Sequence, residues 1–194
     1  VLALFGGMPR VRVTPRAVAF GTVLLHILDG ESTHTVEYTT FRSDSYRGGA
    51  HRPDRVHFTR DLHKDALRRD FTVNALYVDL ADGRLFDPLG RGLTDLENRL
   101  LSAADPKRTM DEDGLRVLRL LRLACELDFS IEPHTFSCAK GAVRLLADIS
   151  AERRRDELSK LLLADDRYQM PRARFSLSPV RRGLRLLYAV GALP

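Results

Sequence analysis

The sequence predicts an α+β fold in which a small mixed sheet with helices is followed by an all-helical region. Before residue 90, short runs rich in β-branched and aromatic residues are broken by Gly, Pro and Asp, whereas the later pattern is helical almost throughout. This change predicts two domains, residues 1–90 and residues 91–194. The length of 194 residues, with 44% hydrophobic and 29% charged residues, is typical of a folded soluble protein that buries a core.

Strand-like runs occupy the first region. They are expected at 21–28, 35–41 and 55–58, with a hairpin in which 81–83 turns 76–80 back into 84–87. Alternation along 35–41 places Glu37 on the face opposite Val36 and Tyr38. A carboxylate inside a strand is unusual, so Glu37 is either a solvent-facing residue of a half-exposed sheet or a functional acid.

Helical periodicity begins at Asp61 and continues through the second region. The first helix is predicted over 61–76, with an apolar stripe of Leu62, Ala66, Leu67 and Phe71. Further helices are expected at 93–101, 111–127, 134–146, 151–163 and 180–190.

The densest group of charged candidates lies on the helix predicted over 111–127. It comprises Glu112, Asp113, Arg116, Arg119 and Arg122, beside an expected buried stripe of Leu115, Leu118, Leu121 and Cys125. Steps of three keep successive members near one face, so the row could present one acceptor and several donors to a cleft. Two structural alternatives compete with this interpretation. Thr109 and Glu112 fit a capping box at a helix start, and Asp113 with Arg116 could be a surface ion pair of about 0.2–0.5 kcal/mol.

Two smaller groups carry further candidates. Arg68 and Arg69 are adjacent, so on a helix at most one is expected to serve a given phosphate, and Asp70 with Asn74 could orient a guanidinium or a ribose hydroxyl. The other group, Glu152, Arg153 and Glu157, follows Ser150, which is a good helix N-cap, and is interpreted as interhelical support.

The charge balance points mildly toward polyanionic partners. Lys and Arg total 31 against 26 acids, giving +5, and only four of the 31 are lysines. Arginine favours bidentate contact with phosphate, although a GC-rich genome would enrich it equally. Cys125 and Cys138 form no metal-ligand pattern and are expected to be buried thiols. No apolar run reaches the roughly 20 residues of a membrane helix, so no membrane partner and a cytoplasmic location are expected.

Seven short motifs, all in one order, together resemble the class II tRNA nucleotidyltransferase (CCA-adding enzyme) and bacterial poly(A) polymerase family. They are GTV at 21–23, VEYTTFR at 36–42, RPDRVHF at 52–58, RRDFTVNA at 68–75, DP at 87–88 with DL at 95–96, EDGLR at 112–116, and SAERRRDEL at 150–158. The resemblance implies a polymerase-β-like nucleotidyltransferase head followed by an all-α neck. It also implies template-independent addition of nucleotides to an RNA 3′ end, above all CCA addition to tRNA from CTP and ATP with release of pyrophosphate.

The resemblance assigns expected roles to the candidates. Glu37 would be the catalytic third carboxylate beside two aspartates that hold Mg²⁺. The nucleotide-binding residues would be Arg68, Arg69, Asp70, Asn74, Asp113, Arg116, Arg119 and Arg122. Of these, Arg69 would contact the nucleotide, Asp113 and Arg116 would read the base edge, and Arg119 and Arg122 would lie toward the triphosphate.

The sequence departs from the family pattern in one respect that matters for activity. The GGxVRD loop and DxD strand of that family are absent, and Gly6-Gly7 does not replace them. We therefore expect a chain that is incomplete at both ends and that catalyses no addition alone, although its parent would act on tRNA or another RNA 3′ end and not on DNA. A poly(A) polymerase of the same family and a non-catalytic RNA-binding module on this scaffold are the alternatives.

Overall fold

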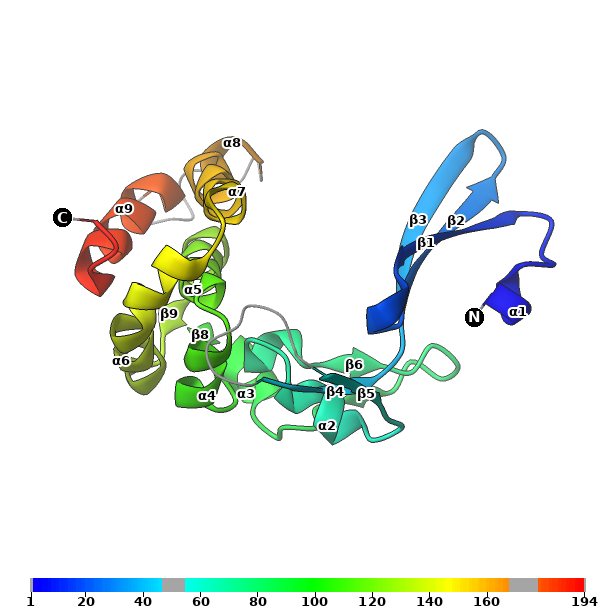
Figure 1. Cartoon of the computed structure of the whole chain (residues 1–194), viewed down its shortest axis with the longest axis horizontal. Helices are drawn as coiled ribbons and strands as arrows, with labels where there is room; N and C mark the ends of the chain where they lie inside the picture. Colours follow the sequence, from blue (N-terminus) through cyan, green and yellow to red (C-terminus); the bar gives the residue numbers. More distant parts are fainter. Residues whose placement is uncertain (1, 47–54, 168–177, 194) are drawn as a thin grey trace.

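A three-stranded antiparallel sheet begins the fold, in a computed structural model that describes residues 2–46, 55–167 and 178–193 (Figure 1). Its strands, in the order β1-β2-β3, are β1 (Val11–Ala17), β2 (Thr22–Asp29) and β3 (Ser32–Thr39), with α1 (Leu2–Phe5) before them and η1 (Val18–Phe20) between β1 and β2. Cross-strand pairing joins Val23 to Tyr38 and Leu24 to Glu37. Glu37 therefore lies on the face opposite the buried Val23, as the alternation predicted.

The strand β1 was not predicted. Pro15 interrupts its sequence, and a proline argues against a central strand because it cannot donate to the ladder. In the sheet β1 pairs with β2 alone among the described strands, so Pro15 occupies an edge strand, where the missing N–H is tolerated.

Small elements connect the sheet to the helical half. They are β4 (Arg42–Ser45) paired with β5 (Arg55–Phe58), α2 (Leu62–Leu67), η2 (Thr72–Asn74), the hairpin of β6 (Tyr77–Val78) and β7 (Leu85–Phe86), and α3 (Gly92–Glu97). Asp61 caps α2 by accepting hydrogen bonds from the backbone N–H groups of His63 and Lys64.

The helix predicted over 61–76 is much shorter in the structure. It ends at Leu67, because Phe71 leaves the helical path to enter the core and the N–H of Thr72 instead donates to the carbonyl of Ser102. The Thr72 hydroxyl also donates to Asp95 at 2.6 Å. Tertiary contacts have overridden the local helical pattern.

The second half is helical, with one short parallel strand pair. Its elements are β8 (Leu100–Leu101) paired with β9 (Ser130–Ile131), α4 (Pro106–Glu112), α5 (Leu115–Leu127), α6 (Pro133–Ala142), η3 (Val143–Asp148), α7 (Ala151–Leu162), α8 (Ala164–Arg167) and α9 (Pro179–Val190). Ser150 caps α7 as predicted, its hydroxyl accepting from the N–H of Arg153.

The single helix predicted over 111–127 is two helices. Asp113 has an extended backbone, with φ −149° and ψ 107°, and Gly114 is the N-cap of α5, which begins at Leu115. A Cβ on Gly114 would lie 2.9 Å from the carbonyl oxygen of Leu145, so only glycine lets η3 pack on this junction. The proposed capping box is therefore wrong: Glu112 ends α4, and the N-cap of α4 is Asp105.

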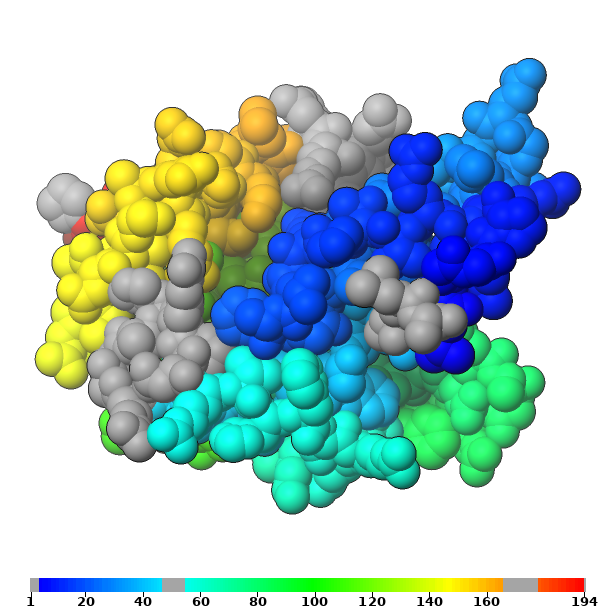
Figure 2. All heavy atoms as spheres, turned by 45° about the vertical axis from the view of Figure 1, so that its right-hand side comes forward, coloured from blue at the N-terminus to red at the C-terminus, as the bar shows by residue number. Residues whose placement is uncertain are grey.

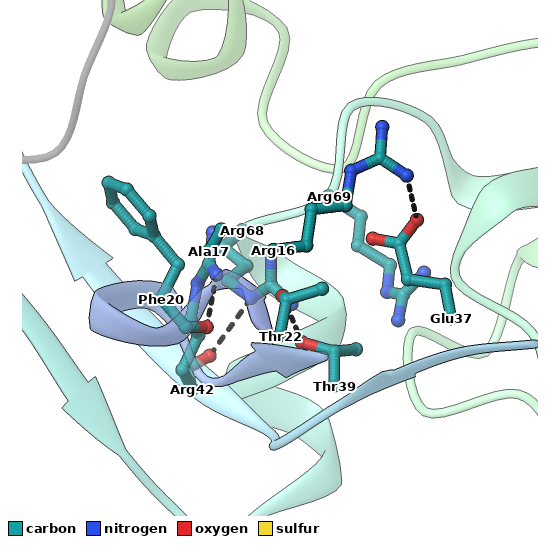
Figure 3. Close-up of a pocket in the computed structure, with 9 residues that line it drawn as sticks. All are labelled: Arg16, Ala17, Phe20, Thr22, Glu37, Thr39, Arg42, Arg68 and Arg69. Carbon is teal, nitrogen blue, oxygen red and sulfur yellow. Dashed lines mark hydrogen bonds and ion pairs between the residues drawn. The ribbon is translucent and has the colours of Figure 1, made fainter. Parts of the chain in front are cut away.

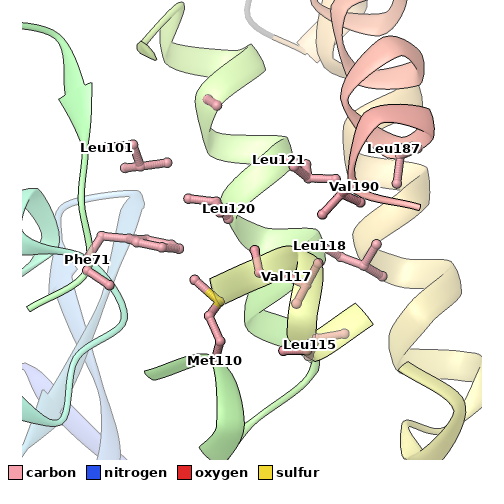
Figure 4. Packing of buried hydrophobic residues seen from close by; sticks show 14 of the residues in the cluster. Phe71, Leu101, Met110, Leu115, Val117, Leu118, Leu120, Leu121, Leu187 and Val190 are labelled. Carbon is pink, nitrogen blue, oxygen red and sulfur yellow. The ribbon is translucent and has the colours of Figure 1, made fainter. Parts of the chain in front are cut away.

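The central helix α5 carries the core. The predicted stripe of Leu115, Leu118, Leu121 and Cys125 is buried, and α7 and α9 pack against the same helix (Figure 4). Phe71, from the first region, lies in this cluster near Leu101 and Leu120 (Figure 4). Because one core includes residues from both sides of residue 90, a division into domains at that residue stays a prediction.

Among the described residues, no helix combines the length and the apolar character needed to cross a bilayer.

Candidate functional site

Two neighbouring pockets share Arg68 and Arg69. The first, of about 420 Å³, lies at the base of the sheet (Figure 3), and its other lining residues are Arg16, Ala17, Phe20, Thr22, Glu37, Thr39 and Arg42. The second, of about 560 Å³, faces the helical half, and its other lining residues are Asp70, Asn74, Asp113, Leu115, Arg116, Arg119 and Arg153. In Figure 2 the surface is hollowed between the blue sheet region and yellow α7. The shared arginines thus join the sheet side of the site to the helix side.

Glu37 lies on β3 and borders the first pocket. Its side chain is 58% exposed, and its Oε2 is 3.5 Å from Nη1 of Arg16. An exposed pair of this kind contributes little to stability, because solvent screens it. Glu37 is thus both solvent-facing, as the structural alternative held, and placed on the pocket.

The described residues do not by themselves fit a magnesium ion. Magnesium takes six oxygen ligands in near-octahedral geometry, usually with one or two carboxylates. Glu37 is the one carboxylate among the described residues that line its pocket, and the described part of the chain holds no cluster of three His, Cys, Asp or Glu suited to a metal. A metal-binding role for Glu37 stays a prediction.

Arg68 and Arg69 both reach both pockets, contrary to the expectation that adjacent arginines diverge. The expectation assumed a continuous helix, but α2 ends at Leu67. Both guanidinium groups bond to the buried carboxylate of Asp65, at 2.7 Å for Arg68 and 3.2 Å for Arg69. Asp65 was missed in the sequence, although its spacing of three and four residues from the two arginines is a usable signal.

Asp70 orients a guanidinium, as its spacing from Asn74 predicted. One carboxylate oxygen accepts from Nδ2 of Asn74 at 3.0 Å, and the other accepts from Nη2 and Nε of Arg119 at 2.6 and 2.9 Å. Burial alone would raise the pKa of Asp70, but the charge of Arg119 and the hydrogen bond from Asn74 outweigh it, so the pKa is lowered. This pair ties the RRDFTVNA segment to α5.

The pair predicts acid sensitivity. A carboxyl group with a depressed folded-state pKa contributes stability above its ordinary pKa, near 3.8, and loses it as the pH falls through the lower folded value. Asp70→Asn should therefore lower the free energy of unfolding by about 1–3 kcal/mol at pH 7, a range discounted because Arg119 is partly exposed. Urea unfolding should show this deficit shrinking below about pH 4. The exposed Asp156→Asn is the control, and a deficit that is constant with pH would contradict the assignment.

Asp113 and Arg116 line the second pocket together but do not pair with each other. Oδ1 of Asp113 accepts from the N–H of Leu115 at 3.0 Å, and Oδ2 lies 3.3 Å from Arg153 on α7. Nη1 of Arg116 pairs with Glu112 at 3.1 Å, and its Nη2 donates to the carbonyl of Arg68 at 3.2 Å. The proposed Asp113–Arg116 ion pair is therefore wrong: Arg116 pairs with Glu112, four residues before it, and Asp113 pairs with Arg153.

Arg122 does not border either pocket, contrary to its expected place near a triphosphate. Its guanidinium is buried and bonds to Glu157 at 2.7 Å and to Glu126 at 2.6 Å. The interhelical role expected of Glu157 is confirmed by this contact, and Arg122 shares that role.

The cysteines carry no metal site within the described residues. Cys125 is fully buried, and burial raises its pKa to about 12. Cys138 is only partly buried, so the expectation of two buried thiols is correct for Cys125 alone. Cys138 lies four residues after His134, a spacing that two ligands on one helix could have, but no group of three metal-binding side chains exists among the described residues.

The second pocket combines one available acceptor with several donors. Five of its lining residues are arginines and two are aspartates, so its charge favours a polyanion. Within the described part of the chain, Nε of Arg116 donates no hydrogen bond, and Asp113 retains acceptor capacity beside Arg153. Such an arrangement can bind phosphates and hydrogen-bond the polar edge of a base.

Comparison with known protein families gives two matches. A sequence model described as "Poly A polymerase head domain" matches residues 10–102, and one described as "Probable RNA and SrmB- binding site of polymerase A" matches residues 128–172.

Curated relatives and solved structures give the same picture. The chain is 45% identical over 150 residues to a CCA-adding enzyme of Lactococcus lactis subsp. cremoris, covering 77% of this chain and 37% of the relative. A CCA-adding enzyme of L. lactis subsp. lactis is 42% identical over 176 residues, covering 90% of this chain and 40% of that protein. The crystal structure of Bacillus stearothermophilus CCA-adding enzyme with CTP aligns at a TM-score of 0.72 and 30% identity, over 93% of this chain and 39% of that chain. A tRNA nucleotidyltransferase complexed with a primer tRNA and an incoming ATP analog aligns at 0.65 and 29%, over 94% and 46%. The chain thus spans about two fifths of the length of these curated relatives.

Proposed function

We propose, from the premise that this chain belongs to the class II tRNA nucleotidyltransferase and bacterial poly(A) polymerase family, that it selects the incoming CTP or ATP for template-independent addition to a tRNA 3′ end. Pyrophosphate is the product released by such a transfer. One observation carries the proposal: Asp113 and Arg116 line a pocket with Arg68 and Arg69, and the same two arginines border the pocket of Glu37. Base recognition and the reacting phosphates would then lie on either side of a shared pair of guanidinium groups.

Base choice follows from donors and acceptors. A carboxylate at Asp113 accepts from an exocyclic amino group, and the guanidinium of Arg116 donates to a ring nitrogen or a carbonyl oxygen. Cytosine and adenine offer this pattern, whereas uracil has no amino group. A base without the match would leave charged groups desolvated and unpaired, which is costly.

The arginines that remain partly exposed would bind the phosphates. Arg119 is 35% exposed and Arg69 is 31% exposed, and each also has a carboxylate partner that limits its motion. A planar guanidinium can donate two hydrogen bonds to one phosphate. Because the described residues alone do not hold Mg²⁺, the proposal is confined to selecting the nucleotide and binding its phosphates.

A titration with the four ribonucleoside triphosphates tests the proposal. The chain should bind CTP and ATP more tightly than UTP and GTP. Arg116→Ala should weaken CTP and ATP binding by about 10–100-fold, the loss expected for a charge-assisted hydrogen bond in a desolvated pocket. Arg84→Ala is the matched control, because Arg84 pairs with Asp82 on an exposed hairpin away from both pockets. The melting temperature of each variant separates lost binding from lost structure.

Other outcomes would favour the alternatives. The net charge of +5 supports an RNA-binding module without nucleotide selection. Salt-dependent binding of RNA, with no preference among the nucleoside triphosphates, would favour that module and contradict the proposal. A preference for ATP alone would favour a poly(A) polymerase of the same family.

A further inference from the structure

We propose that Asp65 and Tyr77 are positioning residues that hold the guanidinium groups of Arg68 and Arg69 at the boundary of the two pockets, and so set the affinity for nucleotide phosphates. The proposal rests on the function proposed above, because its ligand is a nucleoside triphosphate. Neither residue belongs to the motifs that suggested the family, and neither is among the described residues that line these two pockets.

Asp65 is the centre of this arrangement. Its side chain is fully buried, and its Oδ1 accepts from the backbone N–H of Arg42 at 3.0 Å and from Nε of Arg68 at 2.8 Å. Nη2 of Arg68 is 2.7 Å from the same oxygen. The hydrogen bond from Arg42 connects the carboxylate of Asp65 to β4, while its backbone belongs to α2. The acceptor that holds Arg68 is therefore fixed by two elements.

The other oxygen of Asp65 serves Arg69 together with Tyr77. Oδ2 accepts from the Tyr77 hydroxyl at 2.7 Å and from Nη2 and Nε of Arg69 at 3.2 and 3.3 Å. The Tyr77 oxygen in turn lies 3.0 Å from Nε of Arg69. Since the hydroxyl has one hydrogen, it donates that hydrogen to Asp65 and accepts from Arg69 through a lone pair.

The ring of Tyr77 adds a second constraint. The guanidinium carbon of Arg69 lies 4.9 Å from the centre of this ring, and the ring packs edge-on against Phe41 at 5.7 Å between centroids. Burial and the hydrogen bond to Asp65 raise the pKa of Tyr77 to about 12, so the hydroxyl remains a donor at neutral pH. The guanidinium of Arg69 is therefore held by the face of the Tyr77 ring as well as by the carboxylate of Asp65.

The charge balance explains why this arrangement favours an anion. One carboxylate at Asp65 faces two guanidinium groups, and Asp44 pairs mainly with Arg42, at 2.9 Å, while lying 4.0 Å from Arg68. The surplus positive charge is concentrated on Arg68 and Arg69, which both line the pockets. A bound phosphate would neutralise the positive charge that remains after Asp65 has paired with the two arginines.

Tyr77→Phe is the most informative variant, because it removes the hydroxyl and keeps the ring beneath Arg69. It should weaken CTP binding by about 3–10-fold, as expected for losing one hydrogen bond, while binding of cytidine, which has no phosphates, stays within about twofold. Asp65→Asn should lower CTP affinity by about tenfold or more, again with a smaller effect on cytidine. The matched controls are Tyr188→Phe, on an exposed face of α9, and Asp82→Asn, in an exposed ion pair.

The outcomes separate positioning from a purely structural role. Equal losses for CTP and cytidine, or no loss of CTP affinity in Tyr77→Phe, would overturn the proposal. If Asp65→Asn does not fold, Tyr77→Phe still decides.

A second readout needs no nucleotide and keeps the two proposals apart. In ¹⁵N NMR spectra, the Nε–H of Arg69 should exchange slowly in the wild type and faster in Tyr77→Phe. An unchanged exchange rate overturns the positioning role. Failure of the wild type to bind any nucleotide would instead overturn the proposed function.

Discussion

Phe71→Ala is expected to lower the free energy of unfolding by about 3–5 kcal/mol, the usual cost of removing a buried aromatic ring. Phe71 is 1% exposed and lies in the core cluster built around α5. Its neighbours along the chain are tied down by side-chain contacts, Asp70 to Arg119 and Thr72 to Asp95. The ring therefore anchors the RRDFTVNA segment, which carries the shared arginines, to the helical half.

The same variant should weaken CTP binding even where it remains folded. A cavity beneath the segment lets Arg68 and Arg69 shift relative to Arg116 and Arg119, and misplaced donors lose hydrogen bonds. Denaturant unfolding gives the stability change, and a CTP titration at a temperature where the variant is folded gives the binding change. Phe58→Ala, at a 56% exposed ring, is the control, with an expected change below about 1 kcal/mol. Wild-type CTP affinity in a destabilised Phe71→Ala would contradict the anchoring role.

The sequence was most informative where local pattern and packing agree. The stripe from Leu115 to Cys125 repeats every three or four residues, so burial of that face follows from periodicity. Strand alternation predicted the face of the sheet on which Glu37 lies. The spacing of Asp70 and Asn74 suggested that Asp70 could orient a guanidinium, and in the structure this guanidinium is that of Arg119. Motif order supplied the family, and seven of the eight residues that the resemblance assigned to nucleotide binding line the second pocket, Arg122 being the exception.

The sequence misled where a distant contact decides the local conformation. At the break between α4 and α5, the backbone of Leu145, about 30 residues away, packs closely on Gly114. Arg116 pairs with Glu112, four residues before it, and not with Asp113, although both spacings were open to an ion pair. Asp65 was not singled out from the sequence, because its burial depends on β4 and β6.

Arg119 and Arg122, three residues apart on α5, show the same limit of prediction from local sequence. Both follow Arg116 by multiples of three, and a drift of the row around α5 was expected. The drift carries Arg119 to the pocket and Arg122 to α7, where Glu157 is buried. Which of the two arginines borders the pocket depends on the position of α7, which the sequence of α5 does not specify.

Arg122→Met should lower the free energy of unfolding by about 3–5 kcal/mol, the cost of breaking a buried ion pair by removing one partner. The side chains of Glu126 and Glu157 are 3% and 4% exposed, and both bond to Arg122. Without the guanidinium, two nearby buried carboxylates lose their shared cation, and Lys160 at 2.8 Å from Glu157 replaces only part of it. Arg155→Met, on the exposed side of α7, is the matched control, and Arg122→Met with Glu157→Leu should recover part of the loss.

The pH dependence gives this prediction its sign. Burial alone would raise the pKa of Glu157, but the hydrogen bonds from Lys160 and Arg122 outweigh it and lower the pKa below its usual value near 4.5. The stabilisation is therefore present above that value and is lost as the pH falls through the lower folded pKa, so the gap between wild type and Arg122→Met should narrow in acid. Because Arg122 borders neither pocket, the folded variant should bind CTP as the wild type does. A clear loss of CTP affinity in folded Arg122→Met would return this arginine to the nucleotide site and contradict the structural role that its contacts give it.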